Sequence, residues 1–314
     1  MRAVFFGTPD FAVPSLEGLL AAGVSVELVV TRPDRPVGRR AEPIPSPIAR
    51  LAAARGIGVA RPARVRDNGE LLAEIAGGRP DVGVVVAYGR ILPRPLLEIP
   101  RLGFVNVHAS LLPRWRGASP VAAAILAGDR ETGVVTMRVE EALDGGPLYL
   151  EKRVSIGADA TAASLGRRLA ADGAALLVET LRGLQAGTLA PRPQRGEATF
   201  CRPLAREDGE ADWSRPAEEL ERRLRAFTPW PGLFTFAGGE RIKLLEGRVG
   251  PGCEGAPGAV SVAGDRALVC AADGTSLEIV RAQRAGRSPV RGIELARSLR
   301  PGTRLGRDTA RPLP

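Results

Sequence analysis

The stretch VGVVV at residues 82–86 indicates the fold class more directly than any other part of the chain. Its residues are apolar on both faces, as in a strand that helices cover on both sides. Other short β-type runs alternate with helical stretches around it. The expected strands are Ala3–Phe6, Val24–Val30, Val82–Ala87, Phe104–Val107, Val134–Val139 and Leu148–Val154, and the expected helices are Phe11–Ala22, Pro47–Arg55, Gly69–Ala76, Pro120–Ala127 and Ala162–Ala186. This alternation predicts an α/β fold with a mostly parallel sheet.

A second part of the chain follows a break in this pattern. Residues 189–210 lose periodicity and are rich in proline and charge, which is typical of a linker. One helix, 216–227, and closely spaced short strands then predict a small β-barrel. The expected strands are Leu233–Phe236, Arg241–Glu246, Ala259–Val262, Ala267–Cys270 and Ser276–Val280. The expected domains are 1–188 and 211–314, and residues 297–314 are expected to be poorly ordered.

Histidine and cysteine are scarce in the 314 residues. His108 is the only histidine, and the three cysteines have no metal-ligand or CxxC spacing, so no metal site is expected. Three cysteines do not make a disulfide framework, and a reduced, cytoplasmic protein is expected. No apolar run approaches the length of a membrane span, and the N-terminal run ends at Gly7, too soon for a signal peptide. No membrane association is expected.

Positive charge is concentrated in two distant stretches. The chain has 44 Lys and Arg against 35 Asp and Glu, and residues 32–66 and 281–314 each hold nine arginines and two acidic residues. Two separated basic stretches are consistent with a polyanionic partner such as nucleic acid. Solvated surface arginines in an arginine-biased sequence would give the same pattern, so charge alone leaves both interpretations open.

The usual phosphate-binding motifs are missing from the chain. No GxGxxG follows a predicted strand, and there is no GxxxxGK[ST]. Because these glycine-rich loops hold the phosphates of dinucleotides and of nucleoside triphosphates, their absence argues against an ordinary dinucleotide enzyme and against a P-loop NTPase.

Residues with catalytic potential are concentrated in LGFVNVHASLLPRWRGASP, residues 102–120. Asn106 and His108 lie on one face of a predicted strand, at its C-terminal end. Ligands of open α/β sheets bind at that end. An amide and an imidazole can together hold an oxyanion. The alternative is a structural histidine that is satisfied by a backbone carbonyl at a strand end.

A later glycine-rich turn, EALDGGP at residues 141–147, presents the carboxylate of Asp144. An aspartate on such a loop is commonly no more than a turn residue. An aspartate that meets the only histidine would instead fix its tautomer. The residues alone leave both interpretations open.

Asn-x-His, the following Ser-Leu-Leu-Pro and the later Leu-Asp-x-Gly resemble the folate-dependent formyltransferase family. The resemblance extends over nearly the whole chain and includes GTPDF (7–11), RPDRPVGR (32–39), AYGRILP (87–93) and RAFTPWPG (225–232). The second and fourth of these motifs point to members that act on a charged tRNA. The resemblance implies a Rossmann-like formyltransferase domain followed by a small OB-like β-barrel domain.

The resemblance also implies a reaction. The formyl group of 10-formyltetrahydrofolate would pass to the α-amino group of methionine on initiator methionyl-tRNA. By analogy, Asn106 and His108 hold the oxyanion of the tetrahedral intermediate, while Asp144 tunes His108 and helps to remove the amine proton. The family's usual G-L-D-T-G is ALDGG here, and we expect the flexible Gly145 to loosen the placement of Asp144.

Binding residues follow from the same resemblance. The folate is expected beside Tyr88, Gly89, Arg90, Ile91 and Leu92, and beside Ser110, Leu111, Leu112 and Pro113. The tRNA is expected to contact Arg39 and Arg40 in the 34–49 loop, and Arg284 and Arg287 in the C-terminal module. No metal is implied, and a monomer is expected.

Two other functions remain open at this point. A formyltransferase could act on an amino sugar nucleotide or another small amine, although two basic stretches favour tRNA. A basic RNA-binding protein without catalytic activity is the other alternative, and the presence of Asn106, His108 and Asp144 argues against it.

Overall fold

The computed structural model describes residues 1–36 and 43–307, which form two compact units. The first unit comprises Met1–Val121, Arg130–Ile156 and Leu165–Arg202, and the second comprises Ala122–Asp129, Gly157–Ser164 and Pro203–Pro314. We describe each unit by itself. The domains 1–188 and 211–314 expected from the sequence stay a proposal about functional boundaries.

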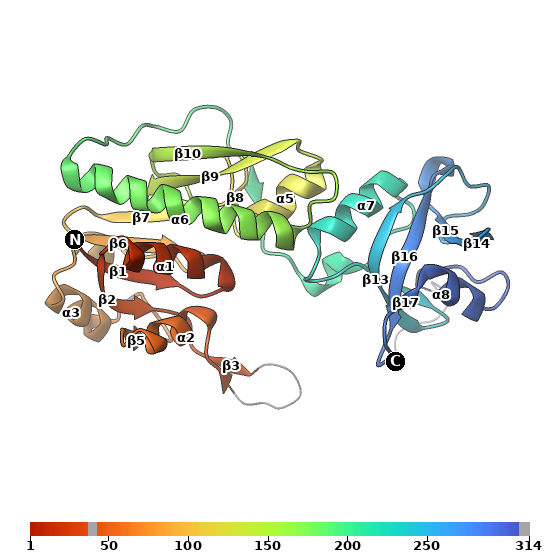
Figure 1. The fold of residues 1–314 in the computed structure, drawn as a ribbon, viewed down its shortest axis with the longest axis horizontal. Coiled ribbons are helices and arrows are strands. Elements are labelled where there is room, and N and C mark those ends of the chain that lie inside the picture. Colours follow the sequence, from red (N-terminus) through yellow and green to blue (C-terminus); the bar gives the residue numbers. More distant parts are fainter. Residues whose placement is uncertain (37–42, 308–314) are drawn as a thin grey trace. The chain divides into compact units, whose positions relative to one another are not determined.

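The first unit is built on a sheet with the strand order β10-β9-β7-β6-β1-β2-β5 (Figure 1). The pairs from β7 to β5 are parallel, whereas β9 and β10 pair antiparallel. The strands are β1 (Arg2–Gly7), β2 (Ser25–Val30), β5 (Gly58–Ala60), β6 (Val82–Val86), β7 (Phe104–His108), β9 (Glu131–Arg138) and β10 (Leu148–Ser155). The predicted α/β fold with a mostly parallel sheet is confirmed. The short strand β5 was not predicted, because it has too few residues to show an alternation of apolar and polar side chains.

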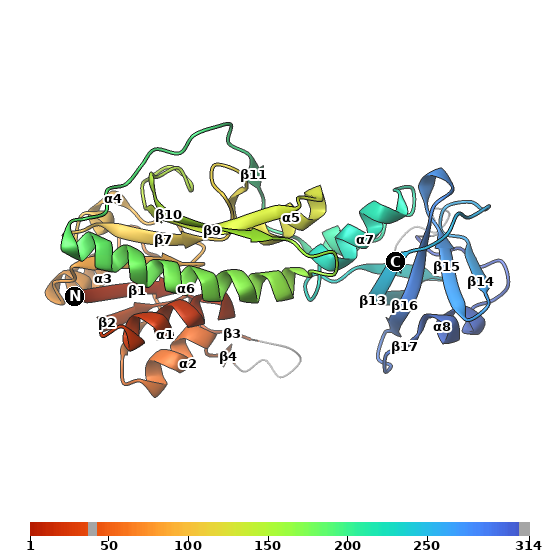
Figure 2. The ribbon, with the colours of Figure 1, turned by 45° about the horizontal axis from the view of Figure 1, so that its top comes forward.

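Helices cover both faces of this sheet. On one face, Val4, Phe6 and Phe104 form a buried cluster with side chains of α3 and α4. On the other face, α6 runs along the sheet (Figures 1 and 2). The helices are α1 (Val13–Ala21), α2 (Pro47–Ala54), α3 (Gly69–Gly77), α4 (Arg94–Leu97), α5 (Pro120–Ala127) and α6 (Ala162–Ala186). None of the described helices is both long and apolar enough to cross a membrane.

Side-chain caps start two of these helices. The Ser46 hydroxyl accepts a hydrogen bond from Ala49 N at 3.1 Å, directly before α2, and Asn68 Oδ1 accepts one from Leu71 N at 3.1 Å, before α3. Such caps satisfy backbone N–H groups that have no partner within the helix. The two caps therefore determine the residues at which α2 and α3 begin.

Gly173 allows α6 to pack closely on the strands that carry the candidate site. A Cβ atom at this position would lie 2.7 Å from Val107 Cγ1 of β7 and 3.0 Å from Val134 Cγ2 of β9. Distances this short mean that a side chain would push the helix and the strands apart. The carboxyl end of β7 carries Asn106 and His108. This close contact between α6 and β7 therefore helps to position the strand that presents the two candidate residues.

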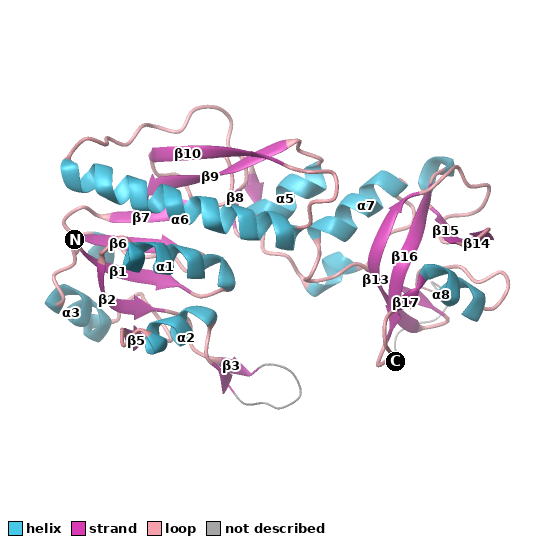
Figure 3. Ribbon diagram, viewed as in Figure 1, coloured by secondary structure: helices cyan, strands magenta, loops and turns pink. Residues whose placement is uncertain are grey.

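The second unit contains an antiparallel half-barrel with the strand order β12-β13-β16-β15-β14, in which β17 also pairs with β16 (Figure 3). Helix α7 (Ala217–Ala226) packs against β13 and β16, and α8 (Gly292–Ser298) packs against β15 and β16. The strands are β12 (Phe234–Ala237), β13 (Glu240–Val249), β14 (Val260–Ala263), β15 (Arg266–Cys270), β16 (Ser276–Arg284) and β17 (Val290–Arg291). The predicted helix followed by a small barrel-like domain is confirmed.

Residues 297–307 are ordered, contrary to the expectation for 297–314. Leu305 N donates a hydrogen bond to the Gly258 carbonyl at 2.7 Å, and Gly306 N donates one to the Phe236 carbonyl at 2.9 Å. These partners are distant in sequence and are backbone atoms, so local composition gave no sign of them. Residues 308–314 lie outside the described part of the chain.

The expectation of three reduced cysteines is also wrong, because Cys253 and Cys270 form a disulfide in the structure. Backbone pairing brings them together: Cys253 N donates to the Gly274 carbonyl at 2.8 Å, and Gly258 N donates to the Cys270 carbonyl at 2.7 Å. The loop before β14 therefore folds back on β15. A separation of 17 residues matches no motif from which this pairing could be read.

We predict that Gly173→Ala lowers the free energy of unfolding by about 1–3 kcal/mol, since it overpacks the contact with β7 and β9. Gly166→Ala in the same helix is the matched control, because a Cβ atom there meets nothing within 4 Å. The control should raise stability by up to about 1 kcal/mol. Urea denaturation followed by circular dichroism measures both, and equal stability of the two variants would contradict the packing described here.

Candidate active site

Asn106 and His108 lie at the carboxyl end of β7, between a parallel and an antiparallel neighbour. Asn106 pairs with Val85 of β6 and with Met137 of β9, and His108 pairs with Val135 of β9. The two side chains share one face because they are two residues apart in a strand. Asn106 is half-buried and His108 is buried. The strand thus presents two hydrogen-bonding side chains at the sheet edge where α/β ligands bind.

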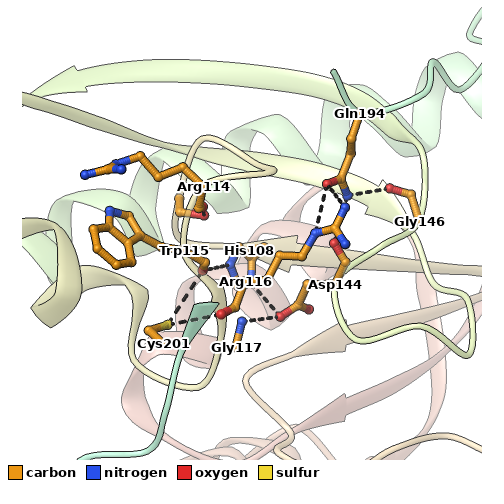
Figure 4. Close-up of polar contacts among 10 residues, drawn as sticks. His108, Arg114, Trp115, Arg116, Gly117, Asp144, Gly146, Gln194 and Cys201 are labelled. Carbon is orange, nitrogen blue, oxygen red and sulfur yellow. Dashed lines mark hydrogen bonds and ion pairs between the residues drawn. The ribbon is translucent and has the colours of Figure 1, made fainter. Parts of the chain in front are cut away.

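Both ring nitrogens of His108 face protein oxygen atoms (Figure 4). Nε2 lies 3.0 Å from the Trp115 carbonyl oxygen, and Nδ1 lies 3.7 Å from Asp144 Oδ2. A carbonyl only accepts hydrogen bonds, so this bond assigns the proton to Nε2. Nδ1 is then the ring nitrogen left for a reacting group. The sequence left open a structural histidine that is satisfied by a backbone carbonyl. The structure shows such a bond at one of the two ring nitrogens.

Asp144 is held by its backbone conformation and by a second loop. Its φ of 47° is in the left-handed region, which aspartate tolerates better than most residues. Its Oδ2 accepts a hydrogen bond from Gly117 N at 2.8 Å. The same oxygen thus bonds to a backbone amide and faces the His108 ring. Across residues 1–36 and 43–307, no group of three or more His, Cys, Asp or Glu side chains is arranged to hold a metal ion.

The loop of residues 109–117 is held in place by residues 199–201, which belong to the segment that was expected to be a linker. Trp115 N donates to Thr199 Oγ1 at 2.9 Å, and β8 (Arg116–Gly117) pairs in parallel with β11 (Phe200–Cys201). Gly117 is required in this pair: its φ is 116°, and a Cβ atom would lie 2.2 Å from the Cys201 carbonyl oxygen. The segment therefore helps to build the site instead of only joining two domains.

The residues expected to bind folate divide into buried and accessible ones. Tyr88 and Leu92 pack in the buried cluster beneath the sheet, and burial raises the pKa of the Tyr88 hydroxyl. Gly89 and Ile91 are exposed, and the Gly89 carbonyl accepts a hydrogen bond from Arg32 Nη2 at 2.6 Å. Arg90 Nη1 donates to the Pro62 carbonyl at 3.0 Å. Backbone groups and the Ile91 side chain are what this loop offers to a ligand.

The second group of expected folate residues follows β7 directly. The Ser110 hydroxyl is buried and donates to the Arg114 carbonyl at 2.6 Å, so it stabilises the loop. Leu112 packs in a small buried cluster with residues of β9 and β10. Leu111 and Pro113 are half-buried. Since β6 and β7 are parallel neighbours, both groups start from the same edge of the sheet.

The residues expected to bind tRNA differ in their surroundings. Arg39 and Arg40 lie outside the described residues. Arg284 forms an ion pair with Glu240, and its Nη2 donates to Ser298 Oγ at 2.9 Å. Arg287 is exposed, and within residues 1–36 and 43–307 no carboxylate pairs with it. Arg287 is therefore the more available of the two C-terminal arginines.

Some contacts that build the site had no recognisable signal in the sequence. Gln194 joins the two site loops, Thr199 holds Trp115, and Arg32 holds Gly89. Two of the three lie in the segment that reads as a linker. Their partners are mostly backbone atoms, which leave no sequence pattern.

Comparisons with known proteins identify the family of this chain. The model of the Formyl transferase family matches residues 1–181, and the model of the Formyl transferase C-terminal domain matches residues 203–300. The chain belongs to the formyl transferase family. Methionyl-tRNA formyltransferase of Thermus thermophilus is 47% identical over 98% of this chain and 99% of its own length. That of Acidobacterium capsulatum is 44% identical over 98% of this chain and 100% of its own. The resemblance seen in the sequence is confirmed.

Several solved structures share the fold at low sequence identity. The sugar 3N-formyl transferase WlaRD matches with a TM-score of 0.66 and 15% identity over 92% of this chain and 99% of its own. HypX of Aquifex aeolicus in complex with tetrahydrofolic acid matches with a TM-score of 0.61 and 18% identity, over 94% of this chain. The chain spans about half the length of HypX. At this identity the matches show the fold alone.

Cys201 provides a chemical probe of this formyl transferase site. Burial raises the pKa of its thiol, the negative charge of Asp144 raises it further, and a backbone hydrogen bond at Ser119 lowers it. The Sγ–H group lies 3.4 Å from the Arg116 carbonyl oxygen and 3.7 Å from that of Trp115. Because only the thiolate reacts, a raised pKa means slow alkylation at neutral pH.

We predict that Cys201 reacts with iodoacetamide more slowly than a free cysteine at neutral pH, and that the rate rises with pH to a midpoint above the ordinary thiol pKa. Asp144→Asn removes a negative charge and should increase the rate at neutral pH. Mass spectrometry of the alkylated peptide measures this. Asp159→Asn, a change at an exposed residue, is the control. Equal rates for the two variants would mean that Asp144 does not face this thiol.

Proposed function

We propose that this chain transfers the formyl group of 10-formyltetrahydrofolate to the α-amino group of methionine on initiator methionyl-tRNA. One observation carries the proposal: Asn106, His108 and Asp144 lie at the carboxyl edge of the sheet in a chain that is 44–47% identical to methionyl-tRNA formyltransferases over nearly its full length. The Formyl transferase models match both parts of the chain.

The reaction joins the methionine nitrogen to the formyl carbon. Attack by the neutral amine forms the new C–N bond and places negative charge on the formyl oxygen. The oxyanion then collapses, the bond between the formyl carbon and the folate nitrogen breaks, and tetrahydrofolate leaves with a proton. Fixed hydrogen-bond donors at about 3 Å from the oxyanion stabilise this intermediate. Asn106 supplies an amide N–H group for this purpose.

His108 acts through Nδ1 in this proposal, because Nε2 is already bonded to Trp115. The gap of 3.7 Å between Nδ1 and Asp144 Oδ2 allows one reacting atom or one water molecule to lie within hydrogen-bond distance of both. In the imidazolium form of His108, in which Nε2 and Nδ1 both carry a proton, Nδ1 donates to the oxyanion. Asp144 accepts the proton that the amine loses, directly or through water.

The folate would be held by the loops that follow β6 and β7. Backbone groups of residues 88–92 suit the polar edge of a pterin, and the exposed Ile91 offers an apolar contact. The formyl carbon would then lie toward Asn106 and His108. Arg32 keeps the Gly89 carbonyl in place and thereby shapes this loop.

A tRNA acceptor is favoured over a small amine. The relatives that share 44–47% identity are methionyl-tRNA formyltransferases, whereas the sugar formyl transferase WlaRD shares 15%. Arg287 is an exposed basic residue of the C-terminal unit, and Arg39 and Arg40 of the 34–49 loop remain proposed tRNA contacts. We also propose that the chain acts as a monomer in the cytoplasm.

The decisive experiment mixes the purified chain with 10-formyltetrahydrofolate and charged initiator methionyl-tRNA. Formylmethionyl-tRNA is expected as the product. A dTDP-linked amino sugar is offered in parallel, with the same donor. Failure to formylate methionyl-tRNA, under conditions in which a known methionyl-tRNA formyltransferase succeeds, would refute the proposed function.

We predict that Asn106→Ala, His108→Ala and Asp144→Ala each lower kcat by about 10²–10³-fold, the cost of losing one oxyanion donor or proton acceptor. Binding of tRNA should change by less than about twofold, since these groups act on the reacting atoms. Asp159→Ala is the control, at an exposed carboxylate. Steady-state kinetics and filter binding measure the two effects, and an active His108→Ala variant would remove the role of Nδ1.

We predict that Arg287→Ala weakens tRNA binding and lowers the salt dependence of the binding constant by about one phosphate contact. Arg284→Ala should have a smaller effect, because its guanidinium is already paired with Glu240. Binding titrations over a salt series measure both slopes. Equal changes in the two slopes would mean that the ion pair between Arg284 and Glu240 opens, so that Arg284 also binds a phosphate of the tRNA.

A further inference from the structure

Gln194 connects the two loops that hold the catalytic groups of the proposed function (Figure 4). Its Nε2 donates to the Asp144 carbonyl and to the Gly146 carbonyl, both at 2.8 Å. Its Oε1 accepts from Arg116 Nε at 3.2 Å and from Arg116 Nη2 at 2.6 Å. Both donors and the acceptor oxygen of the amide are therefore used.

The two bonds from Nε2 fix the backbone on either side of Gly145. Asp144 has a φ of 47°, and the glycine that follows it has no side chain to restrict the chain. From the sequence, Gly145 was expected to loosen the placement of Asp144. In the structure, the carbonyls of Asp144 and Gly146 are tied to a single amide group, which limits that freedom.

The bonds to Oε1 connect this turn with the loop that binds His108. Arg116 lies between Trp115, whose carbonyl accepts from His108, and Gly117, whose N–H group donates to Asp144 Oδ2. A guanidinium that donates to Oε1 polarises the amide and strengthens the Nε2 donors. One side chain thus sets the relative placement of the His108 loop and the Asp144 loop.

We propose that Gln194 is a positioning residue for formyl transfer, which keeps the Asp144 carboxylate against the His108 ring through its hydrogen bonds to the Asp144 and Gly146 carbonyls. The inference rests on the proposed function. Gln194 acts through Asp144, so its loss should affect the catalytic step and leave substrate binding largely unchanged. A misplacement of about 1 Å at a catalytic group costs up to about 10²-fold in rate.

The test compares Gln194→Met and Gln194→Glu with Gln185→Met, a change at an exposed glutamine of α6. Gln194→Met removes all four hydrogen bonds. Gln194→Glu keeps an acceptor for Arg116 and loses the donors to the two carbonyls. Both Gln194 variants should lose about 10- to 100-fold in kcat, with KM for the folate and for methionyl-tRNA within about twofold of wild type. Full activity of Gln194→Glu would show that the contact with Arg116, and not the hold on Asp144, is what matters.

A double-variant cycle separates positioning from a general loss of structure. In an Asp144→Asn background, Gln194→Met should lower the remaining kcat by less than about twofold, because residues that act as a unit are not additive. An undiminished loss in that background, or a loss confined to KM, would overturn the proposal.

Hydrogen exchange tests the same hold without the reaction. Amides of residues 143–146 should exchange at least about tenfold faster in Gln194→Met than in Gln185→Met. Unchanged exchange would overturn the proposal even if activity fell. If the wild-type chain formed no formylmethionyl-tRNA, the proposed function would fail, and the exchange rates would still show whether Gln194 restrains the Asp144 turn.

Discussion

The pairing of β7 with a parallel strand on one side and an antiparallel strand on the other is the constraint on which the site depends. β6 brings the folate candidates of residues 88–92 to the same edge as His108, since parallel neighbours end together. β9 runs antiparallel to β7, so Val135 lies beside His108 and Arg138, at the end of β9, lies beside Val105. The chain therefore leaves β9 at the opposite edge and folds back through the turn of Asp144, which brings the carboxylate to His108. A one-residue shift of β7 would turn Asn106 and His108 to the other face.

Backbone groups hold the candidate catalytic side chains in place. The carbonyl of Trp115 accepts from His108, the amide of Gly117 donates to Asp144, and the carbonyl of Gly146 accepts from Gln194. Such contacts depend on loop conformation more than on side-chain identity. The site is consequently only as well ordered as the loops that supply these groups, and these loops are held by residues outside the Asn-x-His and Leu-Asp-x-Gly motifs.

Strands with a regular pattern of apolar residues and site residues within a family motif could be predicted from the sequence. Contacts that depend on backbone atoms far away in the chain could not. The apolar runs around Val82–Val86 and Phe104–His108 were identified because side chains in strands alternate or are buried on both faces. His108 and Asp144 were paired through the family motif. Gln194 was missed because its partners lie 48 to 78 residues away and its segment has no periodicity. The Cys253–Cys270 disulfide and the ordered residues 297–307 were missed for a similar reason, since both depend on backbone pairing that local composition does not encode.

The segment that follows α6 supplies the last residues in the chain that help to build the candidate site. Asn106, His108 and Asp144 all lie within residues 1–181, which the first Formyl transferase model covers, whereas Gln194, Thr199 and Cys201 lie in the interval before the second model begins at residue 203. A truncated chain that ended at residue 181 would contain all three candidate catalytic side chains and would lack the partners of Trp115, Arg116 and the Asp144 turn. During synthesis, the site can close only after residue 201 has left the ribosome. Its contacts are long-range in sequence, so the entropy of loop closure opposes their formation.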